Sequence, residues 1–186
     1  MKPPTIREAR ADDLPEYSAL LQRTYAMTYA NDALGLPAEL FSPEIFATAD
    51  TQAYLAHNLR NTDDQRCWVA ESDGKLVGAV TIRRKGVREC ELTGFYVAPE
   101  LQGHGIGKML WTEALTFARD SDVTLDVYAH NAKAIELYKR WGFVEDTARS
   151  ILPPLAGVAG GSAGAVPVHA LSPRIMKKPP IRAVSS

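Results

Sequence analysis

The chain has very little cysteine, no long hydrophobic run and almost no excess charge. Its two cysteines, Cys67 and Cys90, lie in apolar stretches, which favours buried reduced thiols over disulfides or sulfur-rich metal sites. The formal net charge of −1 gives no electrostatic reason to expect nucleic-acid binding. No apolar segment approaches the ~20 residues needed to span a membrane, and the N-terminus has no apolar signal core. We therefore expect a cytoplasmic protein with no nucleic-acid or membrane partner.

A length of 186 residues suits one domain that is large enough to bury a hydrophobic core. We expect this domain to span residues 1–178. Residues 153–167 consist mainly of Gly, Ala and Pro and are predicted to be a loop, and residues 179–186 are predicted to be a C-terminal tail. The four histidines show no metal-ligand spacing, and no metal site is expected.

The chain alternates between extended and helical patterns. Asp12 or Asp13 is placed to cap the first helix, Asp73-Gly74 is a typical hairpin turn, and the basic run 83–86 is interpreted as a solvated hairpin tip. The predicted elements are a strand at Thr5–Ala9, helices at Leu14–Tyr25 and Pro43–Arg60, strands at Cys67–Glu71, Lys75–Arg83 and Glu91–Val97, a helix from Ile106 to Arg119, a strand at Val123–Ala129, a helix from Asn131 to Gly142, and strands at Val144–Leu152 and Val168–Lys177.

The most informative stretch is the glycine-rich run between the strand Glu91–Val97 and the following helix. Its glycines allow a sharp turn, and the first amides of a helix point outward at the positive end of its dipole. Such a loop is a site for an anion, usually phosphate. A Walker loop would need Ser or Thr after Gly107-Lys108, where Met109 stands. The spacing of Gly103, Gly105 and Gly107 also departs from the dinucleotide fingerprint.

Gln102, Gly105 and Gly107 match the pattern Gln/Arg-x-x-Gly-x-Gly/Ala after a strand. On these residues, and on Asn131-x-x-Ala, Leu-Tyr138 and Gly-Phe143 further on, the sequence resembles the GNAT superfamily of N-acetyltransferases. The likeness is specific within Glu91–Phe143. It implies an α/β fold with a bent, mostly antiparallel sheet, helices on both faces, and two parallel strands that splay apart.

The resemblance implies acetyl-CoA as the acyl donor, with its pyrophosphate on the loop amides. The strand Glu91–Val97 would pair with the acyl-pantetheine arm through backbone groups, which can also face the thioester carbonyl as oxyanion donors. Asn131 would touch the same arm, and a plain helix cap is an equal alternative. The implied cofactor-binding residues are Phe95, Tyr96, Val97, Gln102, Gly103, His104, Gly105, Ile106, Gly107, Lys108, Asn131 and Tyr138.

Two residues are candidates for proton transfer. Tyr138 lies seven residues, about two helical turns, after Asn131 and therefore on the same helix face; the family commonly places a general acid there. The alternative is a core aromatic. Glu91 resembles the glutamate base of the histone-acetylating branch, and the alternative is a surface charge, with Glu89 as a second choice. A carboxylate needs a raised pKa or a water relay to deprotonate an ammonium.

The predicted function is acetyl transfer to a primary amine of a small molecule, polyamine-like or amino-compound-like. The acceptor pocket is expected between Tyr25 and Leu59, with Tyr29, Glu39 and Asp50 as further candidates to face a cationic amine. The alternatives are a non-catalytic acyl-CoA sensor and an enzyme that acetylates a protein N-terminus or lysine. A homodimer formed through the apolar segment Val168–Met176 is possible.

Overall fold

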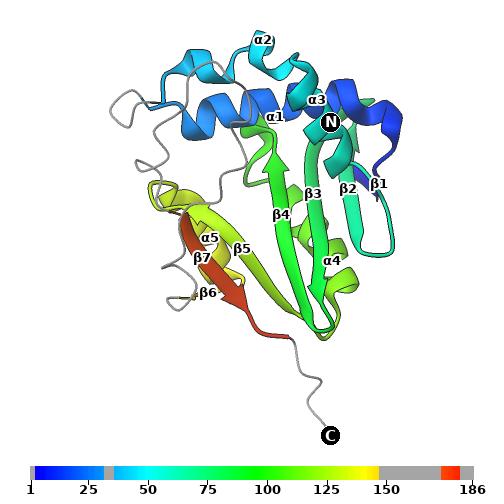
Figure 1. The fold of residues 1–186 in the computed structure, drawn as a ribbon, viewed down its shortest axis with the longest axis vertical. Helices are drawn as coiled ribbons and strands as arrows, with labels where there is room; N and C mark the ends of the chain where they lie inside the picture. Colours follow the sequence, from blue (N-terminus) through cyan, green and yellow to red (C-terminus); the bar gives the residue numbers. More distant parts are fainter. Residues whose placement is uncertain (1–2, 32–35, 147–172, 181–186) are drawn as a thin grey trace, which may run out of the picture.

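A single seven-stranded sheet with helices on both faces organises the molecule (Figure 1). The computed structural model describes residues 3–31, 36–146 and 173–180. The main elements are β1 (Thr5–Glu8), α1 (Leu14–Tyr29), α2 (Pro43–Phe46), α3 (Ala49–Asn58), β2 (Gln65–Ser72), β3 (Lys75–Gly86), β4 (Glu89–Val97), α4 (Ile106–Ala118), β5 (Asp122–Tyr128), α5 (Ala132–Arg140), β6 (Val144–Glu145) and β7 (Pro173–Lys178).

The sheet has the strand order β1-β2-β3-β4-β5-β7-β6. The β4–β5 pair is parallel, and the other neighbours are antiparallel. The parallel pairing extends only from Glu89↔Asp122 to Leu92↔Leu125, and beyond it the strands diverge (Figure 1). The predicted mixed sheet with two splayed parallel strands is confirmed. The split leaves the second half of β4 without a described strand partner on its β5 side.

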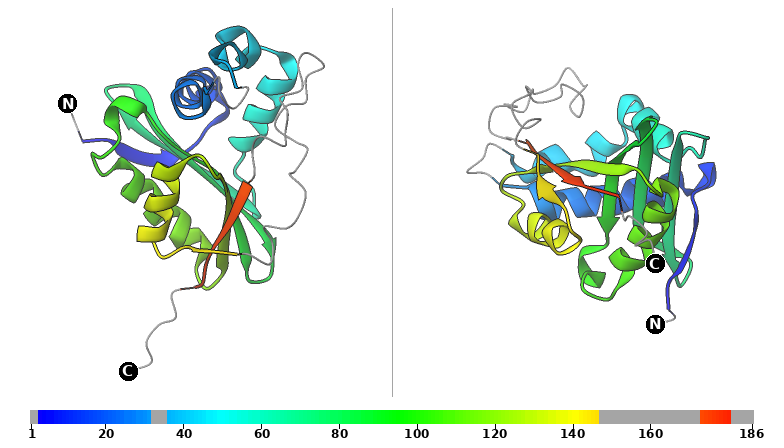
Figure 2. Two further views of the ribbon diagram at one scale, coloured as in Figure 1. Left: turned by 90° about the vertical axis from the view of Figure 1, so that its left-hand side faces the viewer. Right: turned by 90° about the horizontal axis from the view of Figure 1, so that it is seen from below.

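The helices form a layer on each face of the sheet (Figure 2). On one face α1 packs over β3 and β4, and Tyr25 of α1 reaches Tyr96 of β4. On the other face α4 packs over β2, β3 and β4, and Tyr138 of α5 lies against Phe95. Neighbouring side chains of β4 therefore contact helices on opposite faces of the sheet, as expected of a strand buried on both faces.

Three local predictions were wrong for identifiable reasons. The predicted helix Pro43–Arg60 is interrupted because Thr48 is extended, with ψ 147°, and its hydroxyl donates to Ile45 O at 2.9 Å; such side-chain bonds compete with helix. Asp13 precedes α1 without a side-chain capping bond, since Arg7 holds its carboxylate. The run 83–86 is the end of β3. The predicted loop 153–167 lies outside the described residues, as do residues 147–152 of the predicted strand Val144–Leu152.

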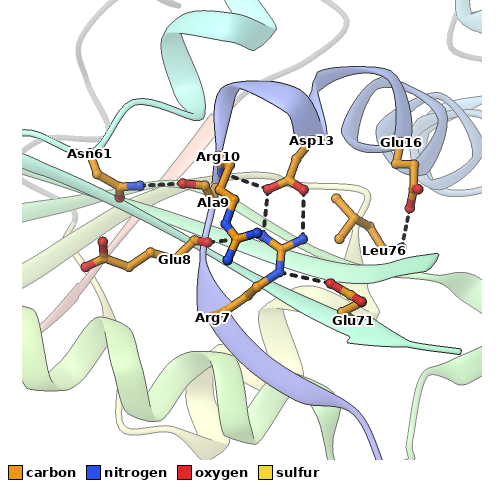
Figure 3. Close-up of polar contacts among 9 residues, drawn as sticks. All are labelled: Arg7, Glu8, Ala9, Arg10, Asp13, Glu16, Asn61, Glu71 and Leu76. Carbon is orange, nitrogen blue, oxygen red and sulfur yellow. Dashed lines mark hydrogen bonds and ion pairs between the residues drawn. The ribbon is translucent and has the colours of Figure 1, made fainter. Parts of the chain in front are cut away.

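An arginine-centred network fastens the edge strand to the helical layer (Figure 3). Arg7 of β1 donates two hydrogen bonds to the Asp13 carboxylate, at 2.7 and 2.8 Å, and a third to Glu71 of β2 at 2.9 Å. Asp13 also accepts the backbone N–H of Arg10 at 2.7 Å. Planar arginine and carboxylate groups favour this two-pronged geometry. The hydrogen bond from Arg7, followed by that from the Arg10 backbone, lowers the pKa of Asp13.

We expect Asp13→Asn to lower the free energy of unfolding at pH 7 by about 1–3 kcal/mol, since it removes a charged partner from a partly buried guanidinium. A depressed pKa contributes stability above the usual value of 3.8 and loses it as the pH falls through the folded-state value. The difference between parent and variant should therefore shrink below pH 3.8. Urea unfolding at pH 7 and pH 3 measures it. Asp12→Asn, at an exposed neighbouring position, is the control; equal losses in both variants would contradict the prediction.

Candidate active site

The glycine-rich loop connects the end of β4 to the start of α4. Gly103 and Gly105 have φ values of +86° and +83°, and an added Cβ at either would meet no atom within 4 Å. Left-handed backbone is accessible to glycine at little cost. These two glycines are therefore required by the backbone conformation, and open space lies in front of them.

The first turn of α4 presents unused hydrogen-bond donors. Among the described residues, the backbone N–H groups of Gly105, Ile106, Gly107 and Lys108 have no acceptor, and the first helical bond of this turn runs from Met109 N to Gly105 O at 3.2 Å. Such amides, at the positive end of a thirteen-residue helix, form a cradle for an anion. The sequence predicted donors at these positions, and the geometry fits a phosphate group.

Gly107 has a different role from its two neighbours. A Cβ at this position would lie 3.2 Å from Phe95 Cζ and 3.8 Å from Val97 Cγ2. A side chain here would require the Phe95 ring to move by a few tenths of an ångström, so glycine suits this close approach of α4 to β4. The glycine therefore fixes the distance between the cradle and the open strand edge.

Polar side chains tie the loop to both neighbouring elements. Gln102 donates to Val97 O at 3.3 Å, and its side-chain oxygen accepts from Lys133 of α5 at 2.6 Å. His104 is exposed, and its Nδ1 lies 3.2 Å from Gln102 O. Gln102 thus links the loop to β4 and α5 through hydrogen bonds. His104 and Lys108 are solvent-exposed near the cradle.

A β-bulge at Thr93 determines which β4 side chains share a face. Glu91 pairs with Arg83 of β3, whereas Gly94 pairs with Thr81 and the register shifts between them. The extra residue reverses the alternation, so Glu91 and Tyr96, an odd and an even position, both face the α1 layer. The bulge lies where β4 and β5 separate, and such kinks commonly occur next to functional sites.

Glu91 is held by two cations. Its carboxylate lies 3.1 Å from an Arg83 guanidinium nitrogen and 3.4 Å from Lys85 Nζ, with 22% of its side chain exposed. The run 83–86 therefore lies in β3 and not at the hairpin tip that the sequence predicted, although Arg83 and Lys85 keep 40% and 47% of their side chains exposed. An incoming ammonium would have to compete with these two cations for Glu91.

Sequence reasoning missed a second carboxylate, Asp126 of β5. Thr124 pairs with Glu91, and by strand alternation Asp126 lies on the same face, one step into the split. Asp126 is solvent-exposed, yet partial desolvation by the surrounding protein, followed by the charge of Glu91, raises its pKa, while Lys85 opposes the shift. Among the described residues Asp126 has no ion pair. The available signal was an acid between the apolar residues Leu125 and Val127 of β5.

Tyr138 and Asn131 occupy the two ends of α5. Asn131 caps the helix through its side-chain oxygen, which accepts from Ala134 N at 3.2 Å. Tyr138 is 8% exposed and packs on Phe95 and Phe143, with ring centroids 6.5 and 5.6 Å away. Burial raises its pKa, and its hydroxyl has no hydrogen bond to a described residue. For Asn131, the cap and the predicted contact with the cofactor are compatible, because the cap uses only the side-chain oxygen and leaves the amide nitrogen. For Tyr138, packing in the core and the predicted acid role are compatible, because packing does not use the phenol proton.

An aromatic cluster lines the α1 side of the split. The Tyr25 and Tyr96 hydroxyls are 3.0 Å apart, and Tyr29 meets Tyr128 edge-on at 5.3 Å. His130 stacks on Tyr128 at 5.8 Å, and its buried Nε2 has no partner among the described residues. Of the predicted acceptor candidates, Tyr25 and Tyr29 lie in this cluster, while Glu39 and Asp50 are solvent-exposed.

The fold and site together define a class: an α/β protein that can hold a phosphate-bearing cofactor at a split between parallel strands. Residues 34–143, more than half of the chain, match the Acetyltransferase (GNAT) family. The chain therefore belongs to this family. None of the described helices combines the length and apolar character needed to cross a bilayer, and the described residues contain no cluster of potential metal ligands.

The relatives include the N-alpha-acetyltransferase RimI of Mycobacterium tuberculosis, 43% identical over 77 residues, which are 40% of this chain and 49% of that protein. The peptidyl-lysine N-acetyltransferase YiaC of Escherichia coli is 38% identical over 91 residues, covering 49% and 53% of the two chains. The chain thus spans about half the length of these relatives. The PaiA N-acetyltransferase of Thermoplasma acidophilum, solved in complex with coenzyme A, has a TM-score of 0.66 over 96% of this chain and 99% of that one. At 20% sequence identity, this similarity establishes a shared fold and nothing more.

Proposed function

We propose that the protein is an acetyl-CoA-dependent N-acetyltransferase that acts on a primary amine. The observation that carries the proposal is the open β5-side edge of β4 beside the unpaired amides at the start of α4. The amides suit a pyrophosphate, and an open strand edge suits an extended amide-bearing arm. Acetyl-CoA supplies both groups together with an acetyl thioester that an amine can attack. Family membership and the coenzyme A complex of PaiA support this choice of donor.

The cofactor-binding residues proposed from the sequence are consistent with this arrangement. Gly103 and Gly105 shape the cradle, Gly107 sets its distance from β4, and Gln102 links the loop to Val97 and α5. In the second half of β4, Phe95, Tyr96 and Val97 belong to the stretch without a β5 partner. The backbone groups of this stretch that point away from β3 are therefore available to the cofactor arm and to a developing oxyanion.

Tyr138 is proposed to protonate the leaving thiolate. Its raised pKa keeps the phenol protonated throughout the physiological range. An ordinary phenol is a weaker acid than an ordinary thiol by about 1.5 pKa units, or about 2 kcal/mol, and burial of Tyr138 increases that gap. The phenol must therefore donate its proton as the bond to sulfur breaks, and a shielded position beside Phe95 suits such a concerted step.

The proton of the amine is proposed to pass to a carboxylate at the split, directly or through water. Asp126 meets this need better than Glu91, because its pKa is raised and it has no ion pair with a described residue. Glu91 is held by Arg83 and Lys85 and raises the pKa of Asp126 by its charge. We therefore assign the base to Asp126 and a tuning role to Glu91.

We expect Asp126→Asn to lower kcat/KM at least ~10-fold and to abolish its decline at acidic pH, because the base must be deprotonated to act. In Glu91→Gln the loss of the neighbouring charge lowers the pKa of Asp126, so the decline should move to lower pH. Profiles of kcat/KM against pH for both variants measure these shifts. A larger loss in Glu91→Gln, with a normal acidic limb in Asp126→Asn, would return the base to Glu91.

The acceptor is proposed to be a cationic primary amine that enters on the aromatic side of the split. The hydroxyl-bearing rings of Tyr25, Tyr29 and Tyr128 suit an ammonium group. A carboxylate lies near this cluster, since burial and then the charge of Asp126 raise the pKa of Tyr128. A small-molecule amine fits this description. A peptide α-amino group or a lysine fits it equally, and the names of RimI and YiaC favour a peptide.

The test is calorimetric titration with acetyl-CoA and, as a control anion, NAD, followed by measurement of CoA release on polyamines, amino compounds and peptides. Micromolar binding of acetyl-CoA alone, with release on one class of amine, is expected and would identify the acceptor class. Binding without release on any amine would indicate a sensor domain. The absence of acetyl-CoA binding would refute the assignment of the glycine loop.

A further inference from the structure

Two adjoining hollows lie at the end of the sheet where β3 turns into β4 and where α4 ends. The first, about 330 Å³, is lined by Arg66, Arg84 and Arg119 together with Trp68 and Phe117. The second, about 390 Å³, shares Arg84 and Arg119 and adds Arg88. Volumes near 300 Å³ lie at the lower end of the range for small-molecule sites.

These hollows are distinct from the proposed active site. The glycine loop adjoins the end of β4 and the start of α4, whereas the hollows adjoin the hairpin before β4 and the end of α4 (Figure 1). The thirteen residues of α4 separate the two regions by roughly 20 Å. The proposed reaction uses none of the residues that line the two hollows.

Two of the three guanidinium groups in the first hollow, those of Arg84 and Arg66, are held by contacts with their neighbours. Arg84 lies over the Phe117 ring at 4.5 Å and donates to Phe117 O at 3.0 Å. Arg66 lies 5.8 Å from the same ring centroid and 3.6 Å from Glu8. The described lining of the first hollow contains three arginines and one carboxylate, that of Asp63, so positive charge predominates there. Pre-oriented guanidinium groups match the geometry of phosphate oxygens.

Arg119 occupies an unusual backbone conformation next to the first hollow. It has φ +48° and ψ −118°, and Ser121 N donates to Ala118 O at 2.9 Å across it. These values define the first central position of a type II′ turn, which glycine favours. An arginine there is conformationally strained, and strain in non-glycine residues is concentrated at functional sites.

We propose that the first hollow is a second anion site, which takes a small phosphate monoester. The phosphate lies among Arg66, Arg84 and Arg119, and the organic part lies against Trp68 and Phe117. Aromatic rings beside fixed guanidinium groups recognise both halves of such a ligand. This site does not depend on the acetyltransferase assignment.

The first test is a nuclear magnetic resonance titration of the ¹⁵N-labelled full chain with phenyl phosphate at constant ionic strength. The three tryptophan indole N–H signals report position, because Trp68 lines the hollow while Trp111 and Trp141 stack on each other at 5.3 Å beside α5. A saturable shift of the Trp68 signal alone is expected. No saturable shift of Trp68 would overturn the proposal.

Variants then separate a specific site from net charge. Arg119→Gly should weaken phenyl phosphate binding about 10-fold or more without lowering Tm, since glycine relieves the strained turn. Arg84→Lys keeps the positive charge but loses the planar guanidinium, which can donate two parallel hydrogen bonds to one phosphate. This variant should also weaken binding. Arg140→Gln, at an exposed position on α5, is the charge-matched control and should stay within about two-fold of the parent.

A further variant keeps this test separate from the glycine loop. Gly105→Val changes the loop and should leave phenyl phosphate binding at Trp68 unaltered. Equal affinity in the parent, Arg119→Gly and Arg84→Lys would overturn the proposal, as would equal weakening by Arg140→Gln. Failure of acetyl-CoA binding would leave this site unaffected.

Discussion

Replacing Tyr138 by Phe is expected to lower kcat about 10²-fold or more while leaving the Kd for acetyl-CoA within about two-fold of the parent. The change removes the phenol proton that the leaving thiolate would receive. The ring contacts with Phe95 and Phe143 are retained in the variant. Because the hydroxyl has no hydrogen bond to a described residue, its loss should have little effect on stability. Steady-state kinetics and calorimetric titration with acetyl-CoA measure the two quantities.

Tyr17→Phe is the matched control for this experiment. Tyr17 is also a buried phenol, 1% exposed, but it belongs to α1 and lies outside the glycine loop and α5. Loss of this hydroxyl should leave kcat close to that of the parent. If Tyr138→Phe retains full kcat, Tyr138 is a core aromatic and another group, or water, protonates the thiolate.

Gly105→Val is expected to abolish detectable acetyl-CoA binding. Gly105 has φ +83° and open space before it, so a valine would both strain the backbone and place methyl groups where the phosphate must approach the amides. Activity should disappear with binding, in contrast to Tyr138→Phe, in which binding persists. Calorimetric titration over a range up to millimolar acetyl-CoA measures the loss.

The control for strain is Gly74→Val in the turn between β2 and β3. Gly74 has φ +73° and likewise nothing within 4 Å of an added Cβ, so the two variants carry comparable backbone strain. Their stabilities should fall by similar amounts, about 1–2 kcal/mol, but only Gly105→Val should lose the cofactor. Normal acetyl-CoA affinity in a folded Gly105→Val protein would refute the loop as the phosphate cradle.

The glycine-rich loop shows how much of the site could be predicted from residues that are neighbours in the sequence. Strand residues, a proline and three glycines before an apolar periodic segment were sufficient to predict strand, turn and helix N-terminus in the right order. The structure then distinguished the glycines: Gly103 and Gly105 have left-handed backbone, whereas Gly107 is small because Phe95 is 3.2 Å from its missing Cβ. That contact joins residues twelve positions apart and depends on how α4 packs on β4.

The carboxylates show where local information ended. The sequence marked Glu91, and the structure surrounds it with Arg83 and Lys85 and places Asp126 on the same face. A bulge at Thr93, visible only in the register with β3, brings Glu91 and Tyr96 together. In a regular strand these two side chains would lie on opposite faces of the sheet. The residue inserted at the bulge reverses the face of every later position, so they lie on the same face.

By itself the sequence determined most of the elements, the glycine cradle and the resemblance to the GNAT superfamily, because turn chemistry and hydrophobic period act between near neighbours in the chain. Tertiary structure alone decided the ion pairing of Glu91, the face of Asp126, the hold of Arg7 on Asp13 and the arginine-lined hollows at the far end. Each of these depends on strand register or on helix packing between segments distant in sequence. Such contacts form only when the whole sheet is assembled, so no single stretch of the chain encodes them.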